Sequence, residues 1–268
     1  MNIAAMAESL MVARDAALPL PLVTGTHAGF TMSDAYLLAD HIRRLRMARG
    51  ERPRGYKIGF TNRSIWPKYG VSAPIWAPVW DSTLHLIEGT EATVSLAGLV
   101  EPRLEPEIVF GFAKPPRAGM SEGQLADCIE WVAHGFEIVH THFAGWRFQA
   151  PDTVADFGLH GRLLVGPRVA PGLFVSLADE LAAIQLQLLR DDQMVDEGQG
   201  SAVLGGPLTA LRVWVDAMLA QPHGWPIMAG DVVTTGTLTD AWPMVPGQAW
   251  QTRLSDARLP GLRLLAAP

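Results

Sequence analysis

The sequence predicts an α+β fold built on a mixed or mainly antiparallel sheet. Short apolar runs, each bounded by Gly, Pro or Asp, recur from about Tyr56 to Leu238, which is the pattern of strands. Apolar residues at helical spacing are concentrated in the N-terminal fifth and in two later segments. Helices and strands therefore do not alternate as they do in a Rossmann fold.

The N-terminal region is predicted to be mainly helical. A helix that Ser33 can cap stops before Gly50, where glycine is a common terminator. Its apolar face consists of Leu38, Ile42 and Leu45. The chain has 268 residues, of which 49% are hydrophobic, so it can form one large core with a small appendage. We expect a mainly helical region, residues 1–55, packed on a β-rich domain, residues 56–268.

The strand-like runs follow this helical region. They are YKIGF, TLHLI, EIVFGF, FEIVHTHF, GRLLVG, IQLQLL and DVVTTGTL. Apolar and polar residues alternate strictly from Ile184 to Leu188, which predicts a strand with one buried and one wet face. Asp191 and Asp192 then favour a turn into a further strand.

Two helices are predicted among the strands. One begins at Ser121, where Gln124 completes a capping box, and ends near Gly135. Its buried face would consist of Leu125, Cys128, Ile129 and Val132. The other helix has Pro207 in its first turn. Its apolar face would consist of Leu211, Trp214, Val215, Met218 and Leu219.

The charge pattern favours a small-molecule partner. The formal net charge is −6, and no basic stripe is present to neutralise a phosphate backbone, so we expect no nucleic-acid partner. No segment approaches the ~20 apolar residues that span a bilayer, so we expect no membrane partner. The N-terminus lacks the basic start and unbroken apolar run of a secretion signal, and the chain has a single cysteine. We therefore expect a cytoplasmic protein.

Two carboxylates in the stretch EPRLEPEIVFGF are candidate metal ligands. Glu105 and Glu107 would project from the same face of a strand, with Cα atoms roughly 6.5 Å apart. Their mutual repulsion would be relieved by a hard cation such as Mg²⁺. Glu137 is the best candidate for a third ligand. Alternatively, the pair lies on a solvated strand face and Glu137 pairs with an arginine, or His140 and His142 point to zinc.

Two further motifs could complete a site. Lys57 lies in the apolar run YKIGF, where it must snorkel to solvent or enter a closed pocket in which a lowered pKa suits acid–base catalysis. Thr235, Gly236 and Thr237 supply hydroxyls and an accessible backbone N–H. These groups could hold a substrate carboxylate, or they could form a plain strand-end turn.

Seven segments in a fixed order resemble the fumarylacetoacetate hydrolase superfamily, and within it the hydratase/decarboxylase branch that contains 2-oxopent-4-enoate hydratase. They are YKIGFTN, GVSAPIWAPVWDS, EPRLEPEIVFGF, FEIVHTHFAGW, APDTVADFGLHGRLLVG, GQGSAVLGGPLTALRVWV and AGDVVTTGTLT. The resemblance covers roughly residues 56–239. It implies a mixed, rolled β-sheet with a smaller N-terminal region, and a protein that assembles as a homo-oligomer.

The resemblance also implies a function. The chain would be a hydratase that acts on a 2-oxo or 2-hydroxy-dienoic acid of the 2-hydroxypenta-2,4-dienoate type in aromatic-compound catabolism. A decarboxylase, an acylpyruvate-type C–C hydrolase and a non-catalytic ligand-binding relative are the alternatives. Lys57 would be the active-site lysine, Asp81 a proton-transfer acid, and Thr237 a contact of the substrate carboxylate. The ligands of a Mg²⁺ or Mn²⁺ ion would be Glu105, Glu107 and Glu137.

Several positions depart from the family pattern around the implied site. Ser82 replaces a second acid after Asp81, and His140 and His160 fall where other residues are common, so either histidine could take over a proton-transfer role. Aromatic and aliphatic residues also flank the site. These are Trp76, Trp80, Trp146, Phe157 and Leu159. They predict a preference for a substrate with an apolar tail over one that ends in a second carboxylate.

Overall fold

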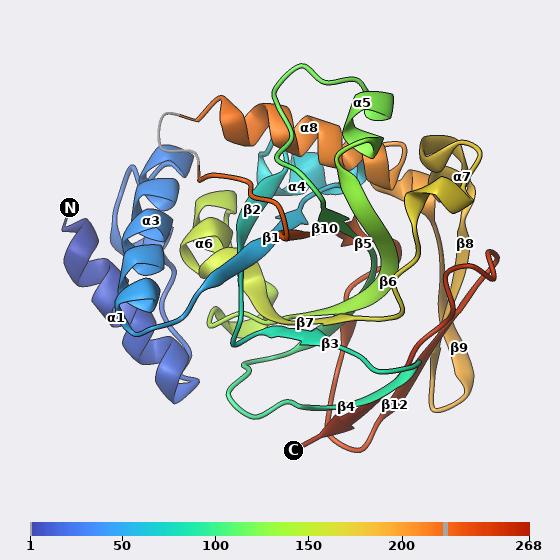
Figure 1. The fold of residues 1–268 in the computed structure, drawn as a ribbon. Helices are drawn as coiled ribbons and strands as arrows, with labels where there is room; N and C mark the ends of the chain where they lie inside the picture. Colours follow the sequence, from blue (N-terminus) through green and yellow to red (C-terminus); the bar gives the residue numbers. More distant parts are fainter. Residues whose placement is uncertain (1, 222–224) are drawn as a thin grey trace.

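Two β-sheets form the body of the molecule, and helices cover its ends (Figure 1). The computed structural model describes residues 2–221 and 225–268. The larger sheet has eight strands in the order β2-β1-β10-β5-β6-β7-β3, with β11 paired to β5. Its strands are β1 Pro53–Gly59, β2 Ile75–Trp80, β3 Leu84–Leu86, β5 Arg103–Phe112, β6 Ile129–Val139, β7 His160–Val165, β10 Val232–Thr237 and β11 Trp242–Pro243.

The smaller sheet has five strands in the order β4-β13-β12-β8-β9. They are β4 Glu91–Ser95, β8 Gln185–Arg190, β9 Gln193–Gln199, β12 Ala249–Leu254 and β13 Arg263–Ala267. Each sheet combines antiparallel pairs with parallel ones: β1 runs parallel to β10, and β13 runs parallel to β4. The predicted α+β class with a mixed, curled sheet is therefore confirmed, and the predicted turn at Asp191 and Asp192 joins β8 to β9.

Three helices form the N-terminal region: α1 Ile3–Ala16, α2 Val23–Thr26 and α3 Met32–Ala48. Figure 1 shows α1 and α3 side by side, with α6 Ala150–Ala155 against α3. The predicted cap of α3 was wrong. Thr31, not Ser33, is the N-cap, because its hydroxyl accepts a hydrogen bond from the Asp34 N–H and the Asp34 carboxylate bonds back to the Thr31 N–H.

The remaining helices are α4 Trp66–Tyr69, α5 Glu122–Ala126, α7 Leu177–Ala183 and α8 Pro207–Leu219. Helix α8 lies across one end of the curled sheet (Figure 1) and packs on β10. By length and composition alone, Gly200–Leu219 could cross a membrane, contrary to the prediction that no segment is long and apolar enough to do so. In its most apolar stretch, 56% of the window is buried inside the molecule. Leu211 and Trp214 are fully buried, which is typical of a core helix.

The helix predicted from Ser121 to Gly135 was largely wrong. The capping box of Ser121 and Gln124 starts α5, but α5 ends at Ala126 and strand β6 begins at Ile129. Residues Ile129–Val139 are buried at nearly every position. A strand that is buried on both faces shows no period of two, so its apolar run resembles that of a buried helix.

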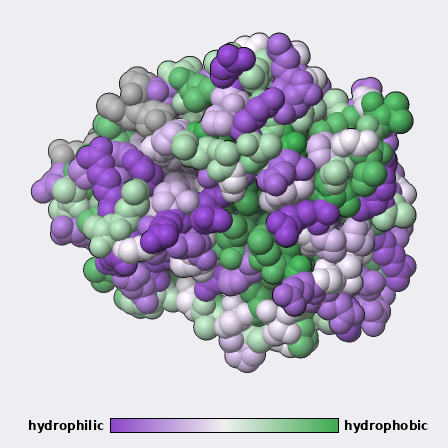
Figure 2. Space-filling model, in the orientation of Figure 1, coloured by the Kyte–Doolittle hydropathy of each residue, from purple (hydrophilic) through white to green (hydrophobic). Residues whose placement is uncertain are grey.

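The outer surface is mixed. On the face seen in Figure 2, hydrophilic residues cover most of the rim, and a band of hydrophobic residues runs through the centre.

The predicted burial of Cys128 is confirmed, since its exposure is 1%.

Candidate active site

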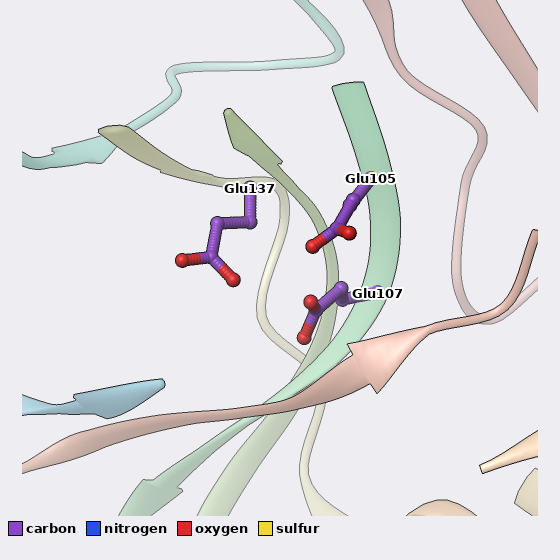
Figure 3. Close-up of side chains that lie close together, drawn as sticks. All are labelled: Glu105, Glu107 and Glu137. Carbon is purple, nitrogen blue, oxygen red and sulfur yellow. The ribbon is translucent and has the colours of Figure 1, made fainter. Parts of the chain in front are cut away.

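Three carboxylates meet on the inner side of the larger sheet. Glu105 and Glu107 extend from β5, and Glu137 extends from β6 toward the same space (Figure 3). The antiparallel register places Glu105 directly opposite Glu137. One oxygen of each carboxylate lies within 4.8 Å of the other two. Glu107 and Glu137 are fully buried and Glu105 is half-buried, so the alternative of a solvated strand face does not hold.

Lys57 reaches this cluster from across the sheet. The strand order β1-β10-β5-β6 separates β1 from β6 by two intervening strands, which in a flat sheet would amount to roughly 14 Å at ~4.8 Å per strand. Nevertheless, Lys57 Nζ lies 3.2 Å from Glu137 Oε2, and both side chains are buried. The curl of the sheet therefore turns these strands toward a common concave side.

Burial and like charge shift the pKa values of the acids. Burial, assisted by the charge of Glu137, raises the pKa of Glu105 to about 7. Burial and the charges of the two other acids raise the pKa of Glu107 well above its usual range. For Glu137, burial is outweighed by Lys57 and by a hydrogen bond from His160, which together lower its pKa. The protein thus brings together more negative charge than Lys57 can neutralise.

The pKa expected for Lys57 was wrong in direction. Burial favours the neutral amine, but the charges of Glu137, Glu105 and Glu107 outweigh it and raise the pKa of Lys57. The metal-free cluster therefore holds Lys57 as an ammonium group. A divalent ion on the carboxylates would offset their charge and make this ammonium a better proton donor.

Glu107 is held by the backbone of strand β10. The Gly236 N–H donates to Glu107 Oε2 at 2.7 Å. Gly236 has φ +99°, and a Cβ there would lie 1.8 Å from Thr61 Oγ1, so only glycine fits. Glu107 Oε1 accepts no hydrogen bond from any residue that the structure describes. A buried carboxylate oxygen without a donor, beside two further carboxylates, fits a hard divalent cation.

His160 completes the surroundings of Glu137. Its Nδ1 lies 2.8 Å from Glu137 Oε1, and its Nε2 lies 2.9 Å from Thr83 Oγ1. Burial lowers the pKa of His160 despite the neighbouring carboxylate. Because both ring nitrogens are occupied by protein partners, this geometry does not support the predicted proton-transfer role for His160.

A cavity of about 210 Å³ opens beside the carboxylates and is lined by Lys57 and Glu105. Its outer wall is aromatic. The Tyr69 ring stacks between Phe60 and Phe148, with centroids 5.0 and 5.6 Å away, and Trp146 contacts Phe148. The cavity can therefore take a molecule whose one end reaches the carboxylates while the other end lies against aromatic rings.

Two of the three predicted substrate-binding residues line the cavity, and the third does not. Thr237 and Gly236 line the cavity, although the Thr237 hydroxyl donates to the Thr239 carbonyl and the Gly236 N–H is used by Glu107. Thr235 is fully buried and its hydroxyl donates to the Ile108 carbonyl. This hydrogen bond joins β10 to β5, so the role of Thr235 is structural.

Two predicted catalytic residues lie away from the cavity. Asp81 is exposed, and its carboxylate accepts a hydrogen bond from the Arg52 N–H. His140 lies beyond the end of β6, where its Nδ1 accepts from the Val100 N–H and burial lowers its pKa to about 3. Neither is among the cavity-lining residues, so the geometry does not support them as proton-transfer groups.

The zinc alternative is not supported either. His142 Nδ1 is bonded to Asp156 at 2.6 Å. Among residues 2–221 and 225–268, the carboxylate cluster is the one group of three or more potential metal ligands.

The predicted apolar wall is only partly composed of the predicted residues. Trp146 and Leu159 line the cavity. Trp80 and Phe157 instead line a separate small cavity beside α3, and Trp76 stacks on Tyr36.

Arg103 lines the cavity although it was not among the residues predicted for the site. Its guanidinium lies 4.1 Å above the Trp146 ring, and no acid in the described part of the chain is within ion-pair distance of it. The alternation that groups Glu105 with Glu107 also places Arg103 on their side of β5, so the signal was present. Thr83 carried no comparable signal.

Comparison with known proteins places these features in context. The chain is 33% identical to a 2-hydroxyhexa-2,4-dienoate hydratase of Comamonas testosteroni, over 90% of this chain and 88% of the relative. It is 30% identical to a 4-oxalocrotonate decarboxylase of a Pseudomonas species, over 92% of each chain. No family model matches the chain.

A solved structure is similar over almost the whole chain. It is the 4-oxalocrotonate decarboxylase of Pseudomonas putida G7 in complex with magnesium and adipate. The TM-score is 0.89, the identity is 25%, and the match covers 98% of this chain and 97% of the other.

Proposed function

The chain belongs to the hydratase/decarboxylase branch of the fumarylacetoacetate hydrolase superfamily, and on that basis we propose that it is a divalent-metal-dependent hydratase. Its substrate is a 2-oxo or 2-hydroxy-dienoic acid of the 2-hydroxypenta-2,4-dienoate type, formed in aromatic-compound catabolism. The observation that carries this proposal is the cluster of three carboxylates beside a partly aromatic cavity, which consists of the half-buried Glu105 and the buried Glu107 and Glu137. Lys57 joins this cluster through Glu137.

The three glutamates would hold Mg²⁺ or Mn²⁺. The unpartnered Glu107 Oε1 and the raised pKa values of Glu105 and Glu107 support this assignment, because each reflects negative charge that the protein alone leaves uncompensated. A bound divalent ion acts as a Lewis acid that stabilises negative charge on the 2-oxo oxygen of a 2-oxo acid.

Lys57 is the proposed proton-transfer residue. Hydration of the dienol adds a proton at C5, the hydroxyl group of water at C4 and a proton at C3, while the C2 hydroxyl loses its proton and becomes the 2-oxo group. The proton of water and the enol proton together balance the two protons added to carbon. The ammonium of Lys57 lies in the cavity wall next to Glu137 and Glu105 and can supply one of these protons. Thr237, at the rim of the same wall, is the proposed contact for the substrate carboxylate.

A decarboxylase is the second candidate, because one of the relatives and the similar solved structure are 4-oxalocrotonate decarboxylases. Both reactions produce negative charge at the same oxygen of the substrate, so they can share one site. An acylpyruvate-type hydrolase and a non-catalytic binder are less favoured, since neither relative named above carries such a name.

The family resemblance also bears on the location, the assembly and the domain organisation of the whole protein. We infer that it is a cytoplasmic homo-oligomer in which residues 1–55 pack on a catalytic domain of residues 56–268. The similarity to catabolic enzymes that act on small molecules supports the cytoplasmic location. The helices α1, α2 and α3, which precede the first strand, support the division into two regions.

The experiment that tests the function is a turnover assay with the Mn²⁺-loaded protein. With 2-hydroxypenta-2,4-dienoate, we expect the dienol absorbance to disappear and 4-hydroxy-2-oxopentanoate to form. With 4-oxalocrotonate, release of CO₂ would identify the decarboxylase instead. Neither reaction, in a protein shown to bind Mn²⁺, would leave the ligand-binding alternative. The EDTA-treated protein is the control.

A further inference from the structure

His160 and Thr83 lie behind the carboxylate cluster and are joined to it by hydrogen bonds. His160 bonds Glu137 Oε1 through Nδ1 and Thr83 Oγ1 through Nε2, at 2.8 and 2.9 Å. The exposed fractions of His160, Thr83 and Glu137 are 4%, 3% and 0%. The chain of contacts is therefore shielded from water, and neither ring nitrogen is left for the substrate.

The direction of these hydrogen bonds follows from the partners. An ionised carboxylate can only accept, so His160 Nδ1 carries the hydrogen and donates to Glu137. In the neutral ring Nε2 is then an acceptor. The Thr83 hydroxyl lies 2.9 Å from Nε2 and 3.2 Å from the Trp80 carbonyl, and we assign its one hydrogen to the nearer Nε2, which has no other donor in the described part of the chain. Thr83 Oγ1 itself accepts from the Trp80 N–H at 3.1 Å. The hydrogen bonds thus run from the β2–β3 turn toward Glu137.

We propose that His160 and Thr83 are positioning residues that fix Glu137 as a one-oxygen metal ligand. Oε1 is committed to His160, while Oε2 faces Lys57. Without this partner the carboxylate could rotate about its terminal torsion, which has no narrow preference, or turn both oxygens to Lys57. The inference rests on the proposed divalent-ion site.

A second buried histidine provides an internal comparison. His142 Nδ1 bonds the buried carboxylate of Asp156 at 2.6 Å, and Thr141 donates to the same carboxylate. This group likewise consists of a buried threonine, histidine and acid, although the acid is Asp156 rather than a glutamate and it is not part of the metal-ligand cluster. Loss of either histidine should destabilise the fold, whereas only the loss of His160 should weaken metal binding.

The test is calorimetric titration of MnCl₂ into EDTA-stripped proteins, with the thermal unfolding midpoint of each. His160→Leu should weaken Mn²⁺ binding by about 10–100-fold, the usual loss when the hydrogen-bond partner of a metal ligand is removed. His160→Asn, whose amide can take the place of Nδ1, should recover most of the affinity. Thr83→Val should weaken binding less than His160→Leu. The control, His142→Leu, should lower the unfolding midpoint and leave the Kd unchanged.

Two results would overturn the inference: His160→Leu binds Mn²⁺ like the unmodified protein, or His142→Leu loses as much affinity. If His160→Leu does not fold, Thr83→Val decides, because it is nearly isosteric and an unchanged Kd would contradict the proposal. If the unmodified protein binds no Mn²⁺, the metal site itself fails, which is distinct from a failure of the positioning role.

Discussion

Lys57 and Glu137 form a buried ion pair between strands that are not neighbours, with Nζ and Oε2 3.2 Å apart. Among the residues that the structure describes, Lys57 is the one buried cation in this cluster. Its partner Glu137 lies directly opposite Glu105 in the pairing of β5 with β6. The ion pair connects the proposed metal site to the proposed proton donor, and the first prediction follows from it.

Replacing Lys57 by Met should reduce kcat by roughly 10²–10⁴-fold, the usual contribution of a general acid or base. Mn²⁺ binding should be retained or strengthened, because a competing cation is removed from Glu137. Steady-state kinetics and titration of the same sample measure both. The matched control is Lys114→Met, at an exposed lysine. Full activity of Lys57→Met would assign Lys57 a purely structural role.

Replacing Glu107 by Gln should separate stability from metal binding. Glu107 is one of three crowded acids, and burial together with the charges of the other two raises its pKa. Because the substitution removes this acid, the metal-free protein should unfold at the same or a higher temperature. The rise in unfolding temperature on adding Mn²⁺ should be largely lost, because the midpoint depends on binding to the folded state. Differential scanning calorimetry with and without Mn²⁺ makes the comparison. A metal-free variant that is much less stable would contradict the account of charge crowding.

The stability of the metal-free protein should depend on pH. Burial and the charge of Glu137 raise the pKa of Glu105 from 4.5 to about 7, so the folded state holds a proton in this range that the unfolded chain has lost. The stabilisation is complete below pH 4.5 and is lost as the pH rises through 7. The slope should reach at most roughly 1.4 kcal/mol per pH unit for each such group.

Chemical denaturation of the protein and of Glu105→Gln between pH 5 and pH 8 measures this contribution as the difference between the two. Buried histidines such as His140, whose lowered pKa makes stability rise with pH up to about 6.5, contribute equally to both proteins. Saturating Mn²⁺ should stabilise the unmodified protein more at pH 8 than at pH 5. Identical pH profiles for the two metal-free proteins would show that Glu105 is already ionised without the ion.

How much of this site the sequence predicts depends on whether its residues share an element. Glu105 and Glu107 belong to one strand, so the alternation of side chains alone predicts that they share a face. The same alternation predicts that Arg103 lies on that face. The Lys57–Glu137 contact depends on strand order and curl, which no local pattern encodes. Thr83 is likewise joined to His160 only by the parallel pairing of β3 with β7.

The error at residues 127–135 has a different origin. Ile129, Val132 and Phe136 are buried in a central strand, where both faces are apolar and the hydrophobic period that distinguishes strand from helix is absent. Asp81 was carried over by its position in a motif, whereas His140 was predicted to take over a proton-transfer role at a position that departs from the motif. In the structure, a polar side-chain atom of each residue is hydrogen-bonded to a backbone N–H instead.

The outer wall of the cavity predicts a preference for an apolar substrate tail. Burying a small alkyl group against Tyr69, Phe148 and Trp146 should contribute on the order of 1–2 kcal/mol after ordering losses. The kcat/KM for an alkyl-tailed dienoate should therefore exceed that for one ending in a carboxylate. Phe148→Asn should reduce the alkyl preference and spare the unsubstituted substrate. A faster reaction with the dicarboxylate that is lost in Arg103→Met would show that Arg103 governs this end.

The most direct test of the metal site is a crystal structure of the protein grown with Mn²⁺ and oxalate, with anomalous diffraction recorded at the manganese edge. The account predicts one strong anomalous peak among Glu105, Glu107 and Glu137, with an oxygen of each at roughly 2.1 Å and oxalate completing the coordination. A peak elsewhere, or a peak here from which any of the three carboxylates has turned away, would contradict it.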